Sequence, residues 1–236
     1  MEANQWNKRS YIKVDTTKVE NFLTEDEKTV KLFKPNVRSN SDHLQLSIVV
    51  KVFGGDLSVQ MTAKELCCQW NQFGKFHLTS IGLGWMLCSF FSKETMENVL
   101  ARGPWFINDH IIGMDKWSLD FSPLSLKGLS CLIWLRMPNL PLFCWYEINV
   151  ARIASPIGIP LLIDGNMFQW SKREFSKVCV RMELDKQLPS GVWVEGPNGR
   201  FFQKVEYERI SYLGYKCGMI EHLTNSCEVN KLKEGK

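Results

Sequence analysis

The chain has 236 residues, of which 44% are hydrophobic and 23% are charged, so it can build a globular core. Its formal net charge of +4 is too small to indicate nucleic-acid binding by itself. No run of residues approaches the ~20 apolar positions of a membrane span, and the first residues lack the apolar core of a secretion signal. We therefore expect an intracellular protein, of the nucleus or the cytoplasm, with reduced cysteines and no membrane partner.

The charge is distributed unevenly along the chain. Residues 46–169 contain 9 basic and 9 acidic side chains, whereas residues 170–216 contain 9 basic and 6 acidic ones. This local excess is consistent either with an ordinary solvated surface or with contacts to phosphates. Under the second alternative, the phosphate-binding residues are Lys172, Arg173, Lys177, Arg181, Lys204 and Arg209.

The first half of the chain combines a polar leader with a regular series of elements. Residues 1–43 are expected to be partly disordered, with one short helix around Glu25–Phe33. Strand patterns follow at 44–55, 75–84, 85–91 and 110–119, and helix patterns at 62–74 and 92–103, with Thr62 and Ser92 as expected N-caps. The β-α-β-β-α-β order predicts a ferredoxin-like (RRM-like) α+β domain over residues 44–119. Its expected core contains Val50, Leu66, Cys88, Phe90 and Val99.

The second half reads as another small α+β unit. Residues 120–130 are expected to be a linker, and residues 131–210 the unit itself. Strand patterns lie at 131–137, 159–168 and 177–185, with a helix pattern at 145–158. The unit is expected to end in a hairpin over 192–210, because Asn198–Gly199 between two alternating runs is a strong turn signal.

One strand of the first domain carries a candidate base-stacking residue. In RNA-recognition motifs, aromatic side chains on the third strand stack on bases. In the corresponding segment LGWMLCSF, strand alternation directs Cys88 and Phe90 to the core and Trp85 to the opposite face. Trp85 is therefore a candidate for stacking, with Lys51 on the first strand supplying charge. The alternative is that this face packs on the second unit.

A cysteine–histidine cluster near the C-terminus is the most specific local motif. Cys217, His222 and Cys227 have the spacing C-x4-H-x4-C, and a zinc knuckle has the spacing C-x2-C-x4-H-x4-C. Zinc prefers four such ligands in a tetrahedron, and Gly214 stands where the first cysteine is expected. Three ligands leave an open site, so we expect zinc to bind weakly or not at all.

The residues between these ligands also follow the knuckle pattern. Tyr215 and Ile220 occupy the positions that contact unpaired bases in an intact knuckle, whereas Glu221 replaces the usual glycine. We therefore expect residues 211–228 to be a degenerate zinc knuckle and residues 229–236 a tail. The alternative is that the whole segment is a flexible tail with no metal.

Several segments in a fixed order carry a family resemblance. They are GPWFINDHIIGMDKW, LIWLRMPNLP, ARIASPIGIPLLIDG, KVCVRMELD and LPSGVWV, followed by the knuckle. Over roughly residues 30–230 the chain resembles the plant domain-of-unknown-function family 4283 followed by a C-x2-C-x4-H-x4-C knuckle. It is similar to the gag-like proteins of plant non-LTR retrotransposons and to their domesticated copies. The resemblance implies nucleic-acid binding and zinc binding, and it implies no catalysis.

The sequence also lacks the common catalytic motifs. It contains no H-E-x-x-H, no G-x-S-x-G and no P-loop. We therefore expect a non-catalytic protein that binds single-stranded RNA or DNA and has no small-molecule substrate. Self-association is left open. The alternatives are a protein-interaction scaffold that uses its tryptophan-rich faces, and an inactive truncated relic.

Overall fold

The computed structural model describes residues 23–24, 26, 28–54, 57–168 and 175–210. The chain divides into two compact units, residues 1–43 and 44–236. The first contains a turn held by Asp26, whose carboxylate accepts hydrogen bonds from the amides of Lys28 and Thr29, both at 3.1 Å. Helix α1 (Lys34–Leu44) follows and has no buried residue. The helix expected around Glu25–Phe33 is therefore wrong, because the side chain of Asp26 stabilises a turn there instead.

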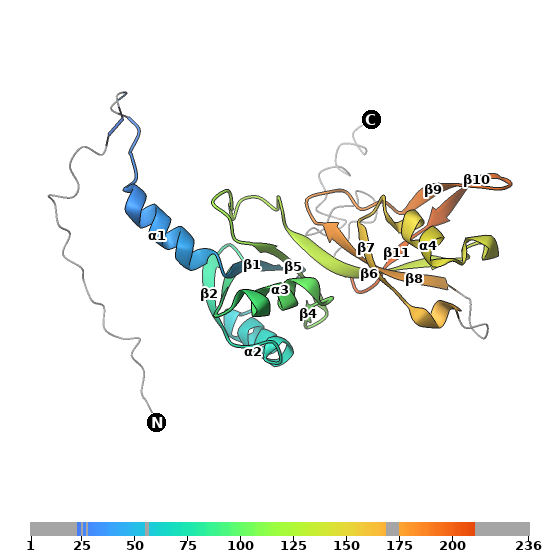
Figure 1. The fold of residues 1–236 in the computed structure, drawn as a ribbon, viewed down its shortest axis with the longest axis horizontal. Helices are drawn as coiled ribbons and strands as arrows, with labels where there is room; N and C mark the ends of the chain where they lie inside the picture. Colours follow the sequence, from blue (N-terminus) through green and yellow to red (C-terminus); the bar gives the residue numbers. More distant parts are fainter. Residues whose placement is uncertain (1–22, 25, 27, 55–56, 169–174, 211–236) are drawn as a thin grey trace, which may run out of the picture. The chain divides into compact units, whose positions relative to one another are not determined.

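The first half of the second unit has the predicted β-α-β-β-α-β order (Figure 1). Its elements are β1 (Ser47–Val52), α2 (Val59–Trp70), β2 (Phe76–Gly82), β3 (Trp85–Phe90), α3 (Lys93–Ala101), the short β4 (Phe106–Ile107) and β5 (His110–Lys116). The strands run in the order β2-β3-β1-β5, and every neighbouring pair is antiparallel. This is the ferredoxin-like arrangement.

Serine side chains set where the two helices of this half begin. The Ser92 hydroxyl caps α3 as predicted and accepts a hydrogen bond from the Thr95 amide at 3.1 Å. Helix α2 begins one turn earlier than expected, because Ser58 rather than Thr62 is its N-cap. The Ser58 hydroxyl accepts a hydrogen bond from the Met61 amide at 3.2 Å, and Thr62 is buried inside the helix.

The predicted core of this half is confirmed. Buried side chains from α2, α3 and one face of the sheet form a single cluster that includes Val50, Leu66, Cys88, Phe90 and Val99. The cluster forms because helical spacing on α2 and alternation along the strands point these apolar residues to the same side.

The second half extends the same sheet. Its elements are β6 (Ser130–Pro138), the 3-10 turn η3 (Leu142–Cys144), α4 (Glu147–Ala154), β7 (Ile159–Ile163), the 3-10 turn η4 (Gly165–Phe168), β8 (Phe175–Glu183), β9 (Gly191–Gly196), β10 (Gly199–Lys204) and β11 (Glu206–Tyr207). The sheet continues in the order β5-β6-β8-β7, β11 also pairs with β6, and β9 and β10 form a separate two-stranded sheet (Figure 1). Within the described ranges no helix is long and apolar enough to cross a membrane.

The two halves share one hydrophobic cluster as well as one sheet. This cluster joins Val49 and Trp85 of the first half to buried residues of β6, α4 and β8. The segment 120–130, expected to be a linker, contributes Phe121, Leu126 and Leu129 to it. The segment therefore packs against the sheet instead of separating two independent cores.

Candidate nucleic-acid interface

Trp85, the predicted stacking residue, lies in the core. Only 2% of it is exposed, and its indole nitrogen donates a hydrogen bond to the Pro123 carbonyl at 2.9 Å. The Phe121 ring packs edge-on against it, with centroids 5.0 Å apart. The ammonium group of Lys51 lies 5.4 Å from its centroid, so the two predicted residues do meet. The chain after β5 covers this face, and the Trp85 ring has no free side for a base.

The predicted basic residues of β8 are engaged in contacts within the protein. The Lys177 ammonium lies 2.8 Å from one carboxylate oxygen of Glu208 and 4.9 Å from the centroid of Trp134. The Arg136 Nε atom lies 3.0 Å from the other oxygen of the same carboxylate. Arg181 donates a hydrogen bond from its guanidinium to the Leu100 carbonyl at 2.7 Å. This face of β8 is therefore cationic but partly neutralised.

The other predicted cations lie apart from β8. The Arg209 guanidinium is 2.7 Å from the Asp109 carboxylate and 4.8 Å from the centroid of Phe106. The Lys204 ammonium is 3.0 Å from Glu206, and its side chain is 66% exposed. Such exposed ion pairs contribute little, so Lys204 can exchange its partner at small cost. The remaining predicted residues lie outside the described part of the chain: Lys172, Arg173, Gly214, Tyr215, Cys217, Ile220, His222 and Cys227.

The β9–β10 hairpin carries an exposed aromatic pair that the sequence analysis missed. Trp193 and Phe202 lie directly opposite each other in the strand register, with centroids 5.4 Å apart and rings inclined at 65°. Trp193 is 73% exposed and Phe202 is 48% exposed. Arg200 and Lys204 occupy alternate positions on the same side of β10, and both are exposed. We call these four residues the hairpin platform.

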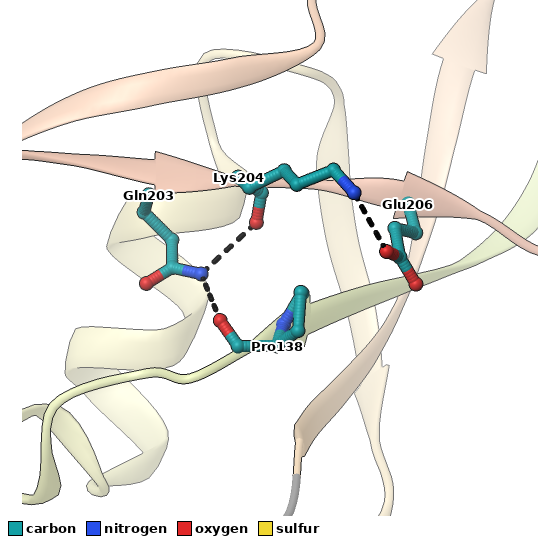
Figure 2. Close-up of polar contacts among 4 residues, drawn as sticks. All are labelled: Pro138, Gln203, Lys204 and Glu206. Atoms are coloured by element: carbon teal, nitrogen blue, oxygen red, sulfur yellow. Dashed lines mark hydrogen bonds and ion pairs between the residues drawn. The ribbon is translucent and has the colours of Figure 1, made fainter.

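The opposite side of the hairpin packs on the protein. Val192 is buried, and Val194 and Phe201 pack against the shared core. Gln203 is 3% exposed, and its amide nitrogen donates hydrogen bonds to the Pro138 carbonyl at 2.8 Å and to the Lys204 carbonyl at 2.9 Å (Figure 2). Gln203 thus ties β10 to the end of β6. Because alternate residues point to opposite faces, this anchoring leaves the platform in solvent.

A second contact supports the base of the hairpin. The Tyr207 hydroxyl donates a hydrogen bond to the Pro189 carbonyl at 2.7 Å. Burial raises the pKa of Tyr207 well above its usual range, so the hydroxyl keeps its proton at any physiological pH. The Phe202 ring also rests on the backbone of Gly191, where an added Cβ would lie 2.6 Å from its Cζ atom. The position of the Phe202 ring therefore depends on this glycine.

The electrostatics of the platform are mixed. Arg200 lies opposite Glu195 in the register, and Lys204 has Glu206 as its partner. The local net charge is therefore small, and the two exposed rings are the groups on which a base could stack. Base–aromatic stacking contributes about 1–3 kcal/mol per base and requires no base pairing in the ligand.

The described residues offer little for metal binding. They contain no group of three or more His, Cys, Asp or Glu side chains that could hold an ion. Cys179, a potential fourth ligand from the folded part of the chain, is fully buried on β8. Burial raises the pKa of its thiol to about 11, although Lys177 and Arg181 oppose the shift. Forming a thiolate there would be costly.

Comparison with known proteins finds a family match for one part of the chain. No curated protein matches the sequence. One similar solved structure is described as the RNA binding domain of Hrp1 in complex with RNA, with a TM-score of 0.26, 10% identity and coverage of 58% of this chain and 80% of that chain. The fold assignment rests on the strand order and register described above. The family model named Domain of unknown function (DUF4283) matches residues 40–125, a range that includes the ferredoxin-like part of this chain.

Proposed function

We propose that the protein binds single-stranded nucleic acid through the hairpin platform and catalyses no reaction. The observation that carries the proposal is the exposed pair of Trp193 and Phe202, flanked by Arg200 and Lys204. Proteins that bind single strands combine aromatic rings, on which bases stack, with cations that contact the backbone phosphates. A paired duplex keeps its bases stacked on one another, so the rings favour single strands.

Segments on either side of the hairpin extend this proposal. Lys172 and Arg173 precede β8, and the degenerate knuckle with Tyr215 and Ile220 follows β11. Their sequence is consistent with additional phosphate and base contacts of the kind found in gag-like retrotransposon proteins. We propose that zinc binds the Cys217, His222 and Cys227 ligands weakly at most, because Gly214 offers no side-chain ligand.

A protein-interaction scaffold is the second candidate function. The exposure of the two hairpin rings also favours this function, because two apolar side chains at the start of α4 are exposed as well: Tyr146 is 75% exposed and Ile148 is 69% exposed. The two functions differ in their response to salt. Binding to nucleic acid releases counterions and weakens steeply as salt rises, whereas an apolar protein interface does not.

A fluorescence anisotropy titration tests the proposed function. A labelled single-stranded RNA of about 15 nucleotides is titrated with the protein at about 50 and 200 mM salt, and a duplex of the same length is the control. We expect the single strand to bind more tightly than the duplex and to bind more weakly at the higher salt concentration. Equal binding of both ligands, or no binding at the lower salt concentration, would contradict the proposal.

A further inference from the structure

A groove of about 490 Å³ runs between helix α4 and strand β9, beside the hairpin platform. One wall consists of α4 residues at helical spacing, namely Asn149, Arg152 and Ile153. The other wall is β9 itself, from Val192 to Gly196. Residues 192–196, nearly the whole of β9, line the groove, so it follows the strand as a site for an extended ligand would.

Strand β9 presents a free backbone edge to this groove. It pairs with β10 on one side and, among the residues that the structure describes, with no strand on the other. An unpaired edge presents a row of N–H and C=O groups that another strand can use. Here the edge lies beside α4, which would obstruct a broad partner sheet more than a single extended segment.

The side chains of the groove indicate the chemistry of its ligand. Phe143, Ile153 and Val192 supply apolar surface, and Phe143 lies close to Gly196, where an added Cβ would be 3.3 Å from its Cε2 atom. Two charged residues line the groove: Glu195 on the β9 wall, which lies opposite Arg200 in the hairpin register, and Arg152 on the α4 wall. Arg152 is exposed and forms no ion pair with a carboxylate in the described parts of the chain. A ligand with apolar side chains at alternate positions and a carboxylate facing Arg152 would satisfy both features.

We propose that this groove binds an extended acidic peptide, which adds to β9 as a third antiparallel or parallel strand. Main-chain hydrogen bonds to the β9 edge would provide affinity, and the apolar wall and Arg152 would provide specificity. The groove and the platform share Trp193, which lines both, whereas Phe202, Arg200 and Lys204 do not line the groove. The peptide proposal therefore rests on Arg152 and the β9 backbone edge, and the nucleic-acid proposal on Phe202, Arg200 and Lys204 as well as Trp193.

Nuclear magnetic resonance with a defined peptide tests the proposal. The probe is a capped peptide of alternating Val and Thr with one central Asp, added to the ¹⁵N-labelled full chain. We expect the amides of Val192–Gly196 to shift and to gain protection from hydrogen exchange. Methylating two alternate backbone nitrogens of the peptide should weaken binding about tenfold, because two main-chain hydrogen bonds are lost. Shifts confined to other elements, or equal binding of the methylated peptide, would overturn the proposal.

Charge variants test the predicted carboxylate contact. Arg152→Glu should weaken binding of the Asp peptide about fivefold and improve binding of the same peptide with Lys in place of Asp. Lys64→Glu makes the same charge change at an exposed position of α2 outside the groove and should change neither affinity. Equal effects of the two variants would overturn the role of Arg152.

The same samples also show whether two copies dimerise through β9, and whether RNA binding and peptide binding can be lost separately. If two copies pair through their β9 edges, sedimentation will show a dimer without peptide, and the peptide proposal will be overturned. Phe202→Ala should reduce RNA binding but leave peptide binding intact, whereas Arg152→Glu should do the reverse. Failure of one proposal can therefore be separated from failure of the other.

Discussion

Trp193 and Phe202 lie directly opposite each other in the β9–β10 hairpin, with ring centroids 5.4 Å apart and exposed fractions of 73% and 48%. The opposite face of the hairpin holds both rings in this position, because Gln203 bonds to the end of β6 and Val192 packs in the shared core. Large aromatic rings fixed in solvent by a packed scaffold are typical of a binding surface.

Removing either ring should weaken binding to single-stranded RNA. Trp193→Ala and Phe202→Ala should each reduce the free energy of binding by about 1–3 kcal/mol, because one base loses its stacking partner. Phe91→Ala is the matched control, since Phe91 is 68% exposed but lies at the end of β3. Anisotropy titrations of the three variants provide the measurement. An effect of Phe91→Ala as large as those of the hairpin variants would show that the hairpin has no special role.

The salt dependence should separate the exposed cations of the hairpin platform from the more buried, engaged cations of β8. Replacing Arg200 and Lys204 together by glutamine should reduce the slope of log K against log salt by about 1.4, because two phosphate contacts are lost from a single strand. Replacing Lys177 and Arg181 should change the slope less, since Glu208 and the Leu100 carbonyl already engage these side chains. The opposite order would identify β8 as the main phosphate-binding surface.

Much of the fold was predictable because its signals are local. Ser92 caps its helix through a contact three residues away, and strand alternation alone directs Cys88 and Phe90 to the core. A hairpin was also predicted around Asn198–Gly199, but its two turn residues are Pro197 and Asn198, because Gly199 already pairs with Gly196. The observed register brings Trp193 opposite Phe202, whereas a two-residue turn at Asn198–Gly199 would have placed Lys204 opposite Trp193. The alternation in VWVEG and GRFFQK therefore indicates that both rings share one face, but the directly opposed pair depends on where the turn lies.

The environment of Trp85 and of the β8 cations could not be predicted in this way. The pattern along β3 is the same whether its second face is open or covered, and the cover includes Pro123, 38 positions further along the chain. Likewise, nothing near Lys177 in the sequence indicates that Glu208 will lie 2.8 Å away. Both contacts depend on how distant segments pack, which the local pattern does not specify.

The hairpin should depend on the side chain of Gln203 for its anchoring. Gln203→Ala removes the donor to two carbonyls at a buried position and should lower the free energy of unfolding by about 1–3 kcal/mol. Gln72→Ala is the control, because that side chain bonds a backbone carbonyl at an exposed position. Urea denaturation measures both. Equal, small effects would mean that the bonds in Figure 2 do not hold the hairpin.

The junction between the two halves should be sensitive to a single methyl group. At Gly113 an added Cβ would lie 2.6 Å from side-chain atoms of Leu129 and Leu184, so Gly113→Ala should destabilise the protein by about 1–3 kcal/mol. Gly165→Ala is the matched control, since nothing lies within 4 Å of its added Cβ. Urea denaturation measures the free energy of unfolding of both variants. If both values equal that of the original protein, the tight packing of the shared core around Gly113 is contradicted.

Restoring the fourth ligand should restore zinc binding. Gly214→Cys supplies the missing thiolate, and the affinity for zinc should rise by orders of magnitude because a closed tetrahedral site replaces an open one. Cobalt substitution followed by absorption spectroscopy measures the change, and the original chain should show weak binding or none. Tight binding by the original chain would contradict the degenerate-knuckle interpretation and require a fourth ligand from elsewhere.

Photo-crosslinking tests the central claim most directly. A single-stranded RNA of about 15 nucleotides that contains 4-thiouridine is irradiated with the full chain, and the attached residues are located by mass spectrometry. Binding through the hairpin platform predicts crosslinks at Trp193 and Phe202, which disappear when competing unlabelled RNA is added. Specific crosslinks that fall only on other segments, such as the β8 surface around Lys177, would contradict the assignment of the platform as the binding site.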